Sequence, residues 1–483
     1  MNSRFSKKLI TVLVTLLFVV LFCGCKKYLD LKPQNSITRD NFFKTKDDAV
    51  SSIIGCYDGL QGCASLFLNW GEFRADLVAA GSSNDVTYPY YHYMDKLKPI
   101  SDWSPVYNMI GRANSVIEFV PGIPANDDKF SVEDSKKIIA EAQFLRALGY
   151  FYLVRTFKEV PLVLQAPSND NVNFFIPKSS ADTILDQIEA DLTAAEANIP
   201  VTFEKNADTR GRATKGAVHA LQTDVYLWRS KYQLAADAAQ KVLTETTLYS
   251  LVPGNNWFNI FSQKNTSESI LEVQFDYSLS ETNNLISNTG NFTMNNVLKA
   301  YYDGALDVTR GLNNTYINGS TWWKYSGLTT TTLIIRPTPD PDFILYRLPD
   351  VMLMKAEALA HLGSFAQKTE AIQLIDAVRT RAAISPYGIS LDGNAPYSLL
   401  IELIIQERAM ELALEGKRWF DLVRVATNDK TPDFLIDRVV KSRSVSERSI
   451  IKSRIIDPRS WYMPISQYEL NRNPQLVQNP YYK

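Results

Sequence analysis

Three glutamates near the C-terminal end have the clearest catalytic potential in this sequence. Glu407, Glu411 and Glu415 are spaced four apart, so a helix would place them near one face. Glycoside hydrolases use a pair of carboxyl groups in this way. However, Arg408 and Arg418 lie in the same segment, and Glu and Arg at such spacings form ion pairs that fix neighbouring helices. We therefore expect a structural ion-pair network, with sugar cleavage as the less favoured alternative.

Other catalytic and metal-binding patterns are weak. The three histidines, His92, His219 and His361, are far apart in the sequence, which disfavours a zinc site. Asp350 and Glu357 are seven apart, as in a structural ion pair or a helix cap. The sequence contains no Gly-x-Ser-x-Gly elbow, phosphate-cradling loop or Cys-x-x-Cys pair. We predict that the protein is not an enzyme and has no metal and no cofactor.

The N-terminus predicts export and a lipid anchor. Three basic residues precede an apolar run over 9–22, which is too short to span a bilayer and fits a signal peptide. Gly24 before Cys25 suits a lipoprotein signal peptidase, so we expect residues 1–24 to be removed and Cys25 to be lipidated. Cys23 is the rival acceptor, and an ordinary secretory signal is the alternative. Acyl chains anchor because each buried methylene contributes about 0.8 kcal/mol.

Charge and cysteine content narrow the class of protein. The formal net charge is −1, and loss of the basic signal peptide makes the mature chain more acidic, which argues against nucleic acid as a partner. Cys56 and Cys63 would lie roughly 10 Å apart on one continuous helix, too far for a disulfide. We expect two buried free thiols, although a turn near Gly59 or Gly62 would allow them to pair.

Apolar residues recur at helical spacing over most of the mature chain. Phe144, Leu148 and Phe151, for example, stand at i, i+4 and i+7. Helix pairs joined by short breaks predict a mainly α, tetratricopeptide-like scaffold with little β structure, and we assign residues 45–483 to one such domain. The predicted helices are a first helix beginning near Thr45 and the segments 108–119, 133–157, 181–199, 218–228, 234–243, 349–362, 365–381 and 398–416.

Two stretches, about 62–105 and 250–345, lack this helical periodicity. We therefore predict loops there, with a short strand over 269–275. So long an irregular stretch is usually functional. Tyr and Trp rings offer a flat face to a sugar, and nearby amides bind its hydroxyls. The alternative is that these rings pack on the scaffold or face a partner. The predicted ligand contacts are Trp70, Asp85, Tyr88, Tyr90, Tyr91, Tyr301, Asn314, Trp322 and Trp323.

Five ordered segments carry a family resemblance. Each is short, but together and in order they cover most of the mature chain and resemble the SusD/RagB family of outer-membrane nutrient-binding lipoproteins. The segments are 141–162 with EAQFLRALGYFYLVR and a later VPL, 212–227 with RATKGA and YL, 346–359 with YRLPDVMLMKAEAL, 405–424 with IQERAMELALEGKRWFDLVR, and 463–480 with MPI, NP and QNP.

The resemblance implies a cellular location and a function as well as a fold. It implies a lipoprotein of the outer membrane, facing outward, that captures glycans for polysaccharide utilisation and acts as a lid on a TonB-dependent SusC-like transporter. Some members of the family take peptides instead. In this reading residues 25–44 are a lipid-anchored tether. Lys26 and Lys27 follow the anchor where an acidic run is the family pattern, and the ligand-contacting loops show no match, so the resemblance itself names no ligand.

Overall fold

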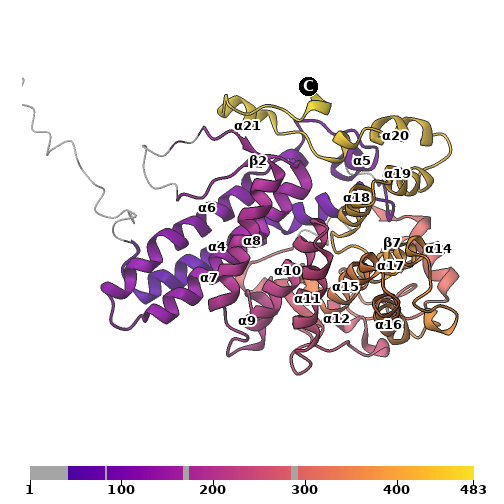
Figure 1. The fold of residues 1–483 in the computed structure, drawn as a ribbon, viewed down its shortest axis with the longest axis horizontal. Coiled ribbons are helices and arrows are strands. Elements are labelled where there is room, and N and C mark those ends of the chain that lie inside the picture. The colour runs from indigo at the N-terminus through magenta and orange to yellow at the C-terminus, as the bar shows by residue number, and fades with distance from the viewer. Residues whose placement is uncertain (1–41, 82–83, 167–172, 174, 284–291) are drawn as a thin grey trace, which may run out of the picture. The chain divides into compact units, whose positions relative to one another are not determined.

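The computed structural model describes residues 42–81, 84–166, 173, 175–283 and 292–483 (Figure 1). The following description concerns the compact unit Thr45–Lys483. The predicted signal peptide and the lipidated Cys25 lie outside the described residues.

Antiparallel helices packed in sequence order make up the scaffold, which confirms the predicted mainly α, tetratricopeptide-like fold. Helix α4 packs on α6, α6 on α7 and α7 on α8, and α10, α11, α15 and α16 continue the pairing (Figure 1). The scaffold helices are α4 (Lys46–Glu72), α6 (Ser104–Phe119), α7 (Val132–Phe157), α8 (Ala181–Asn198), α10 (Lys215–Trp228), α11 (Tyr232–Leu243), α15 (Leu348–Leu362), α16 (Phe365–Arg381), α17 (Tyr397–Leu412) and α18 (Arg418–Asn428).

Shorter helices lie in the two insertions, between α8 and α10, and in the C-terminal region. They are α5 (Asn84–Tyr90), α9 (Asn206–Gly211), α12 (Asn259–Ser262), α14 (Asn296–Ala305), α19 (Pro432–Lys441), α20 (Arg448–Ile455) and α21 (Gln467–Arg472). The first scaffold helix begins where the sequence predicts, because Thr45 and Asp48 form a capping box at the start of α4.

The described strands form four two-stranded antiparallel ribbons. The predicted strand over 269–275 is confirmed as a member of the longest ribbon, whose residues are all buried and which ties the second insertion to α9, α10 and α15. The ribbons are β1 (Val78–Ala79) with β5 (Thr293–Met294), β2 (Val160–Pro161) with β3 (Lys178–Ser179), β4 (Ser269–Val273) with β8 (Phe343–Arg347), and β6 (Tyr316–Ile317) with β7 (Thr321–Trp322).

The first insertion begins later than predicted, because α4 continues without a break to Glu72. The helix therefore includes both Cys56 and Cys63, and both are buried free thiols, as expected from their spacing. The glycines between them stay helical and do not turn the chain.

Helix α17 ends four residues before the predicted stop at Gly416. Ala413 is extended and Leu414 is left-handed (φ 64°), so Glu415 lies in a turn outside the helix. Gly416 has φ +69°, and a Cβ added to Gly71 would overlap its carbonyl oxygen. The two glycines therefore allow a close backbone approach between α4 and this turn.

Glu72 lies fully buried beside this turn and gives a test of pH dependence. Its Oε1 accepts a hydrogen bond from Leu414 N (3.3 Å), and burial raises its pKa from 4.5 to about 8. The raised pKa means that the protonated carboxyl stabilises the folded protein. This contribution to the free energy of unfolding is complete below the pKa that the carboxyl has in the unfolded chain, and it is lost as pH rises through about 8.

We expect Glu72→Gln to match the wild type at acidic pH and to exceed its stability at alkaline pH. Urea unfolding at pH values below 4.5 and above about 8, the two pKa values of the carboxyl, measures this difference. Parallel stability profiles for the two proteins would contradict the assignment.

Candidate functional site

The three glutamates of the C-terminal segment lie in a buried ion-pair network. Arg347, at the end of β8, donates to Glu415 (2.9 and 2.8 Å) and also pairs with Glu411. Arg310 donates to Glu407 and Glu411 at 2.7 Å each. The network also contains Glu268, Trp257, Asp307, Lys324, Arg379 and Arg381. The prediction of a structural network is confirmed.

The charge state of Glu411 does not suit acid–base catalysis. Burial alone would raise the pKa of Glu411, but Arg381, Arg347 and Arg310 hold it well below its usual range. A glycosidase acid needs a raised pKa and contact with the substrate. Glu411 is ionised and has no surface open to solvent. The ion-pair network therefore joins α16, α17, β8 and the second insertion.

The other charged residues singled out from the sequence are also structural. Asp350 pairs with Arg408 (2.8 Å) and Lys417 (3.0 Å), and Glu357 pairs with Arg424 (2.7 Å). In the described part of the chain, no group of three or more His, Cys, Asp or Glu side chains could hold a metal ion.

Four of the predicted ligand contacts are buried in the protein. Trp70 donates its Nε1–H to Ile100 O (2.7 Å), and the side chains of Trp322, Trp323 and Tyr90 also have almost no exposed surface. A buried ring cannot stack on a sugar, so the expectation for these residues is corrected. The physical reason is that large rings gain more from leaving water in an apolar cluster than from remaining exposed in a loop.

The remaining predicted contacts fall into two groups, with Asp85, Tyr88 and Tyr91 on or just after α5 and with Tyr301 and Asn314 in the second insertion. Tyr301 is half-buried on α14, whereas Asn314 lines a hollow of about 710 Å³ together with Leu312 and Tyr316. Asp85 is on α5, and its side chain is outside the described part of the structure. The structure therefore does not bring the nine residues together into one site.

Tyrosines gather at α5 and the turn after it. We call Tyr88, Tyr91 and Tyr93 the α5 aromatic surface. The rings of Tyr88 and Tyr93 lie 6.0 Å apart, and Tyr93 is 53% exposed. Lys98 Nζ stands 3.9 Å from the Tyr88 ring centroid, and Tyr91 OH donates to Glu447 Oε1 (2.8 Å). This surface combines one exposed ring, Tyr93, and two half-buried rings with charged groups that can bind hydroxyls.

Two arginines from the C-terminal region, the buried Arg443 and the half-buried Arg454, fix this surface. Arg443, after α19, donates to Tyr90 O (3.0 Å) and Ala75 O (3.1 Å), and Arg454 on α20 donates to Tyr91 O (2.7 Å). These contacts join residues more than 350 positions apart. Sequence reasoning missed both arginines, and no local pattern in the sequence marks them.

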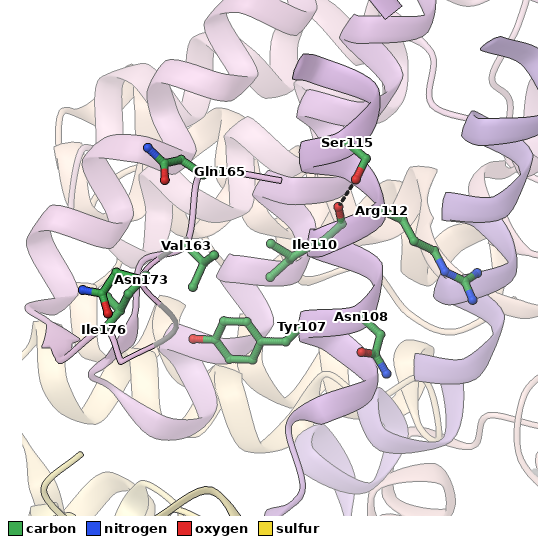
Figure 2. Close-up of a pocket in the computed structure, with 10 residues that line it drawn as sticks. Tyr107, Asn108, Ile110, Arg112, Ser115, Val163, Gln165, Asn173 and Ile176 are labelled. Carbon is green, nitrogen blue, oxygen red and sulfur yellow. Dashed lines mark hydrogen bonds between the residues drawn. The ribbon is translucent and has the colours of Figure 1, made fainter. Parts of the chain in front are cut away.

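A hollow of about 510 Å³ lies between α6 and the segment that follows β2 (Figure 2). Ile110 and Val163 give it an apolar wall, while Asn108 and Gln165 bring amides to the lining. Tyr107 is the one aromatic residue among the described lining residues, and its OH donates to Pro161 O (2.6 Å). The hollow therefore lacks the neighbouring open rings of the α5 aromatic surface, and no sequence pattern pointed to it.

Two family models match the chain. One, described as the SusD family, covers residues 336–482, and the other, described as starch-binding associating with outer membrane, covers residues 27–227. Together they span well over half of the sequence and contain the five segments quoted above. The chain belongs to the SusD/RagB family.

Individual SusD-like proteins match along nearly their whole length. SusD-like protein P38 of Formosa agariphila is 27% identical, over 87% of this chain and 92% of the relative. A laminarin-binding SusD-like protein of known structure is 26% identical, with a TM-score of 0.71 over 90% of this chain and 99% of that chain. A SusD superfamily structure from Bacteroides vulgatus is 21% identical, with a TM-score of 0.75 over 91% and 100%, and shows the shared fold.

No described helix has both the length and the apolar character that a membrane crossing requires.

Proposed function

We propose that this SusD/RagB protein binds a glycan at the α5 aromatic surface, without cleaving it, and delivers it to a TonB-dependent SusC-like transporter. The observation that carries the proposal is the cluster of three tyrosine rings, one exposed and two half-buried, beside Lys98, Glu447 and Arg454. The starch-binding description of one matching family model points in the same direction. The laminarin-binding relative makes laminarin the first glycan to test.

The geometry suits capture followed by release. An open ring face covers the C–H side of a sugar, while carboxylate and ammonium groups bind its hydroxyls. Because Arg443 and Arg454 hold the backbone under the rings, little ordering is needed when the ligand binds. The exposed rings give an open surface, from which a bound chain can be passed on.

The proposal includes an anchor at the outer membrane. Lipidated Cys25 would hold the protein there, and residues 25–44 would form the tether to the folded unit. Acylation supports stable attachment because several chains act together. Cys25→Ala should release the protein from the membrane fraction of cells, and retention of this variant in that fraction would contradict the assignment of the lipid site.

Removal of two rings tests the binding surface. We expect Tyr88→Ala/Tyr93→Ala to weaken glycan binding about tenfold, since each stacked ring contributes about 0.5–1.5 kcal/mol. Calorimetric titration of the chain lacking residues 1–25 against laminarin and a polysaccharide panel measures this change. The matched control is Tyr277→Ala, which removes a tyrosine about as exposed as Tyr93 (51% against 53%) from the short helix Tyr277–Leu279 of the second insertion.

Each outcome has a clear meaning. Equal affinities for the double variant and the control would place the glycan site elsewhere. Silence across the panel, with competition by a peptide digest, would replace the glycan by a peptide ligand. Release of reducing sugar by the wild-type protein would contradict binding without cleavage.

A further inference from the structure

A hollow of about 260 Å³ lies at the C-terminal end of α7. We call it the α7-end pocket. Phe157, Trp461 and Tyr462 give it aromatic walls. Ligand pockets for larger molecules usually exceed about 300 Å³, so this one suits a single sugar residue or a smaller group.

Three cations line this small pocket. Lys158 follows α7, Lys178 lies on β3 and Arg459 precedes the C-terminal segment, so the three come from separate parts of the chain. Glu159 is the one acidic side chain among the described lining residues. Lys178 pairs with Glu159 (2.9 Å), and Arg459 pairs with Asp457 (2.6 Å) just outside the pocket. The described lining therefore carries an excess of positive charge.

Lys158 occupies a strained backbone position. Its φ is 69° and its ψ is −57°, and Glu159 N donates across it to Phe157 O (2.9 Å). This is a γ-turn with positive φ, a rare conformation that costs a non-glycine residue energy. Glycine would adopt it freely, so the backbone does not require a lysine here. Among the described residues, its ammonium has no carboxylate partner, only the Tyr462 ring at 5.6 Å from the centroid.

A fourth cation lies behind the aromatic wall. Arg74 is fully buried and donates to Trp461 O (2.7 Å), while its Nε and Nη2 have no hydrogen-bond partner among the described residues. Burial lowers the pKa of Arg74 to about 9, which still leaves it charged at neutral pH. No described carboxylate pairs with it. Its charge adds to the positive potential of the pocket.

We propose that the α7-end pocket binds an acidic sugar residue, a unit that carries a carboxylate or a sulfate group. The oxyanion accepts hydrogen bonds from Lys158 and Arg459, and the sugar ring packs against the partly exposed Tyr462. This inference rests on the proposed glycan-binding function and adds its substrate class. An acidic glycan would contact both this pocket and the α5 aromatic surface, or the pocket alone if the chain is short.

Matched ligands and variants of Lys158 test the pocket. The chain lacking residues 1–25 is titrated at low and high salt with a neutral oligosaccharide, the same sugar as its uronic acid, and the same sugar sulfated. We expect one acidic form to bind about tenfold more tightly than the neutral form at low salt, with the advantage reduced at high salt. Lys158→Gly should reduce the advantage severalfold, because it removes one of the two proposed donors, and Lys158→Arg should keep it.

The variants separate binding from folding. Glycine fits the positive φ, so Lys158→Gly should unfold at the same temperature as the wild type or higher. Equal binding of neutral and acidic sugars by the wild type, or an acidic preference that is undiminished in Lys158→Gly, would overturn the pocket. Failure of all the sugars to bind would instead overturn the proposed glycan-binding function. If an acidic sugar binds more tightly than the neutral one, comparison of the uronic acid and the sulfated sugar identifies the anion that the pocket prefers.

Discussion

Replacing Glu411 by glutamine is expected to lower the free energy of unfolding by about 3–5 kcal/mol. Glu411 accepts hydrogen bonds from Arg310 (2.7 Å), Arg381 (2.5 Å) and Trp257 (3.3 Å), and it also pairs with Arg347. The glutamine amide keeps the shape but removes the charge. The guanidinium groups of Arg310, Arg347 and Arg381 would then be buried with one carboxylate fewer. A buried charge that has lost its partner is costly, because no water is there to solvate it.

Urea unfolding followed by circular dichroism measures this loss. The control is Glu402→Gln, on the same helix, where a half-exposed glutamate pairs with Arg438. We expect this control to lose less than about 1 kcal/mol, because exposed pairs contribute little. A fully stable Glu411→Gln protein that has lost a sugar-cleaving activity would restore the catalytic alternative.

Alanine at Trp322 or Trp323 is expected to cost about 3–5 kcal/mol of stability at each position. Trp323 packs with Phe258 and Ile317 in a buried cluster, and its Nε1–H donates to Thr329 O (3.0 Å). Trp322 lies on β7 beside Phe292, with ring centroids 6.3 Å apart. Removing either ring leaves a large cavity in the second insertion, so both should act on folding rather than on ligand contact.

Thermal unfolding and glycan titration of the same variants distinguish the two roles. We expect a lower unfolding temperature for Trp322→Ala and for Trp323→Ala, while Tyr93→Ala, which removes an exposed ring, should unfold like the wild type. A stable Trp322→Ala/Trp323→Ala protein with weakened glycan binding would return these rings to the ligand site.

The charged residues show which ion-pair contacts can be predicted from local spacing in the sequence and which cannot. The spacing of Glu407, Glu411 and Glu415 indicated an ion-pair network, but the expected partners were nearby arginines such as Arg408 and Arg418. In the structure Arg418 pairs with Asp76, 342 positions away, and Arg408 pairs with Asp350 and Asp421. Glu411 takes its partners from the second insertion, β8 and α16. The pairing follows packing, which no local window contains.

Local sequence patterns were sufficient to predict the scaffold: periodic apolar residues and capping residues such as Thr45 act within one or two helical turns, so the helices and their pairing could be predicted. Which aromatic rings stay open to a ligand depends instead on long-range packing. Trp322 and Tyr88 both lie in aperiodic aromatic stretches and look alike in the sequence. One is buried against Phe292 and the other remains partly open beside Lys98. Burial of a ring depends on segments far away in the chain, such as the β1–β5 ribbon and Arg443 beneath α5, and these contacts exist only in the folded protein.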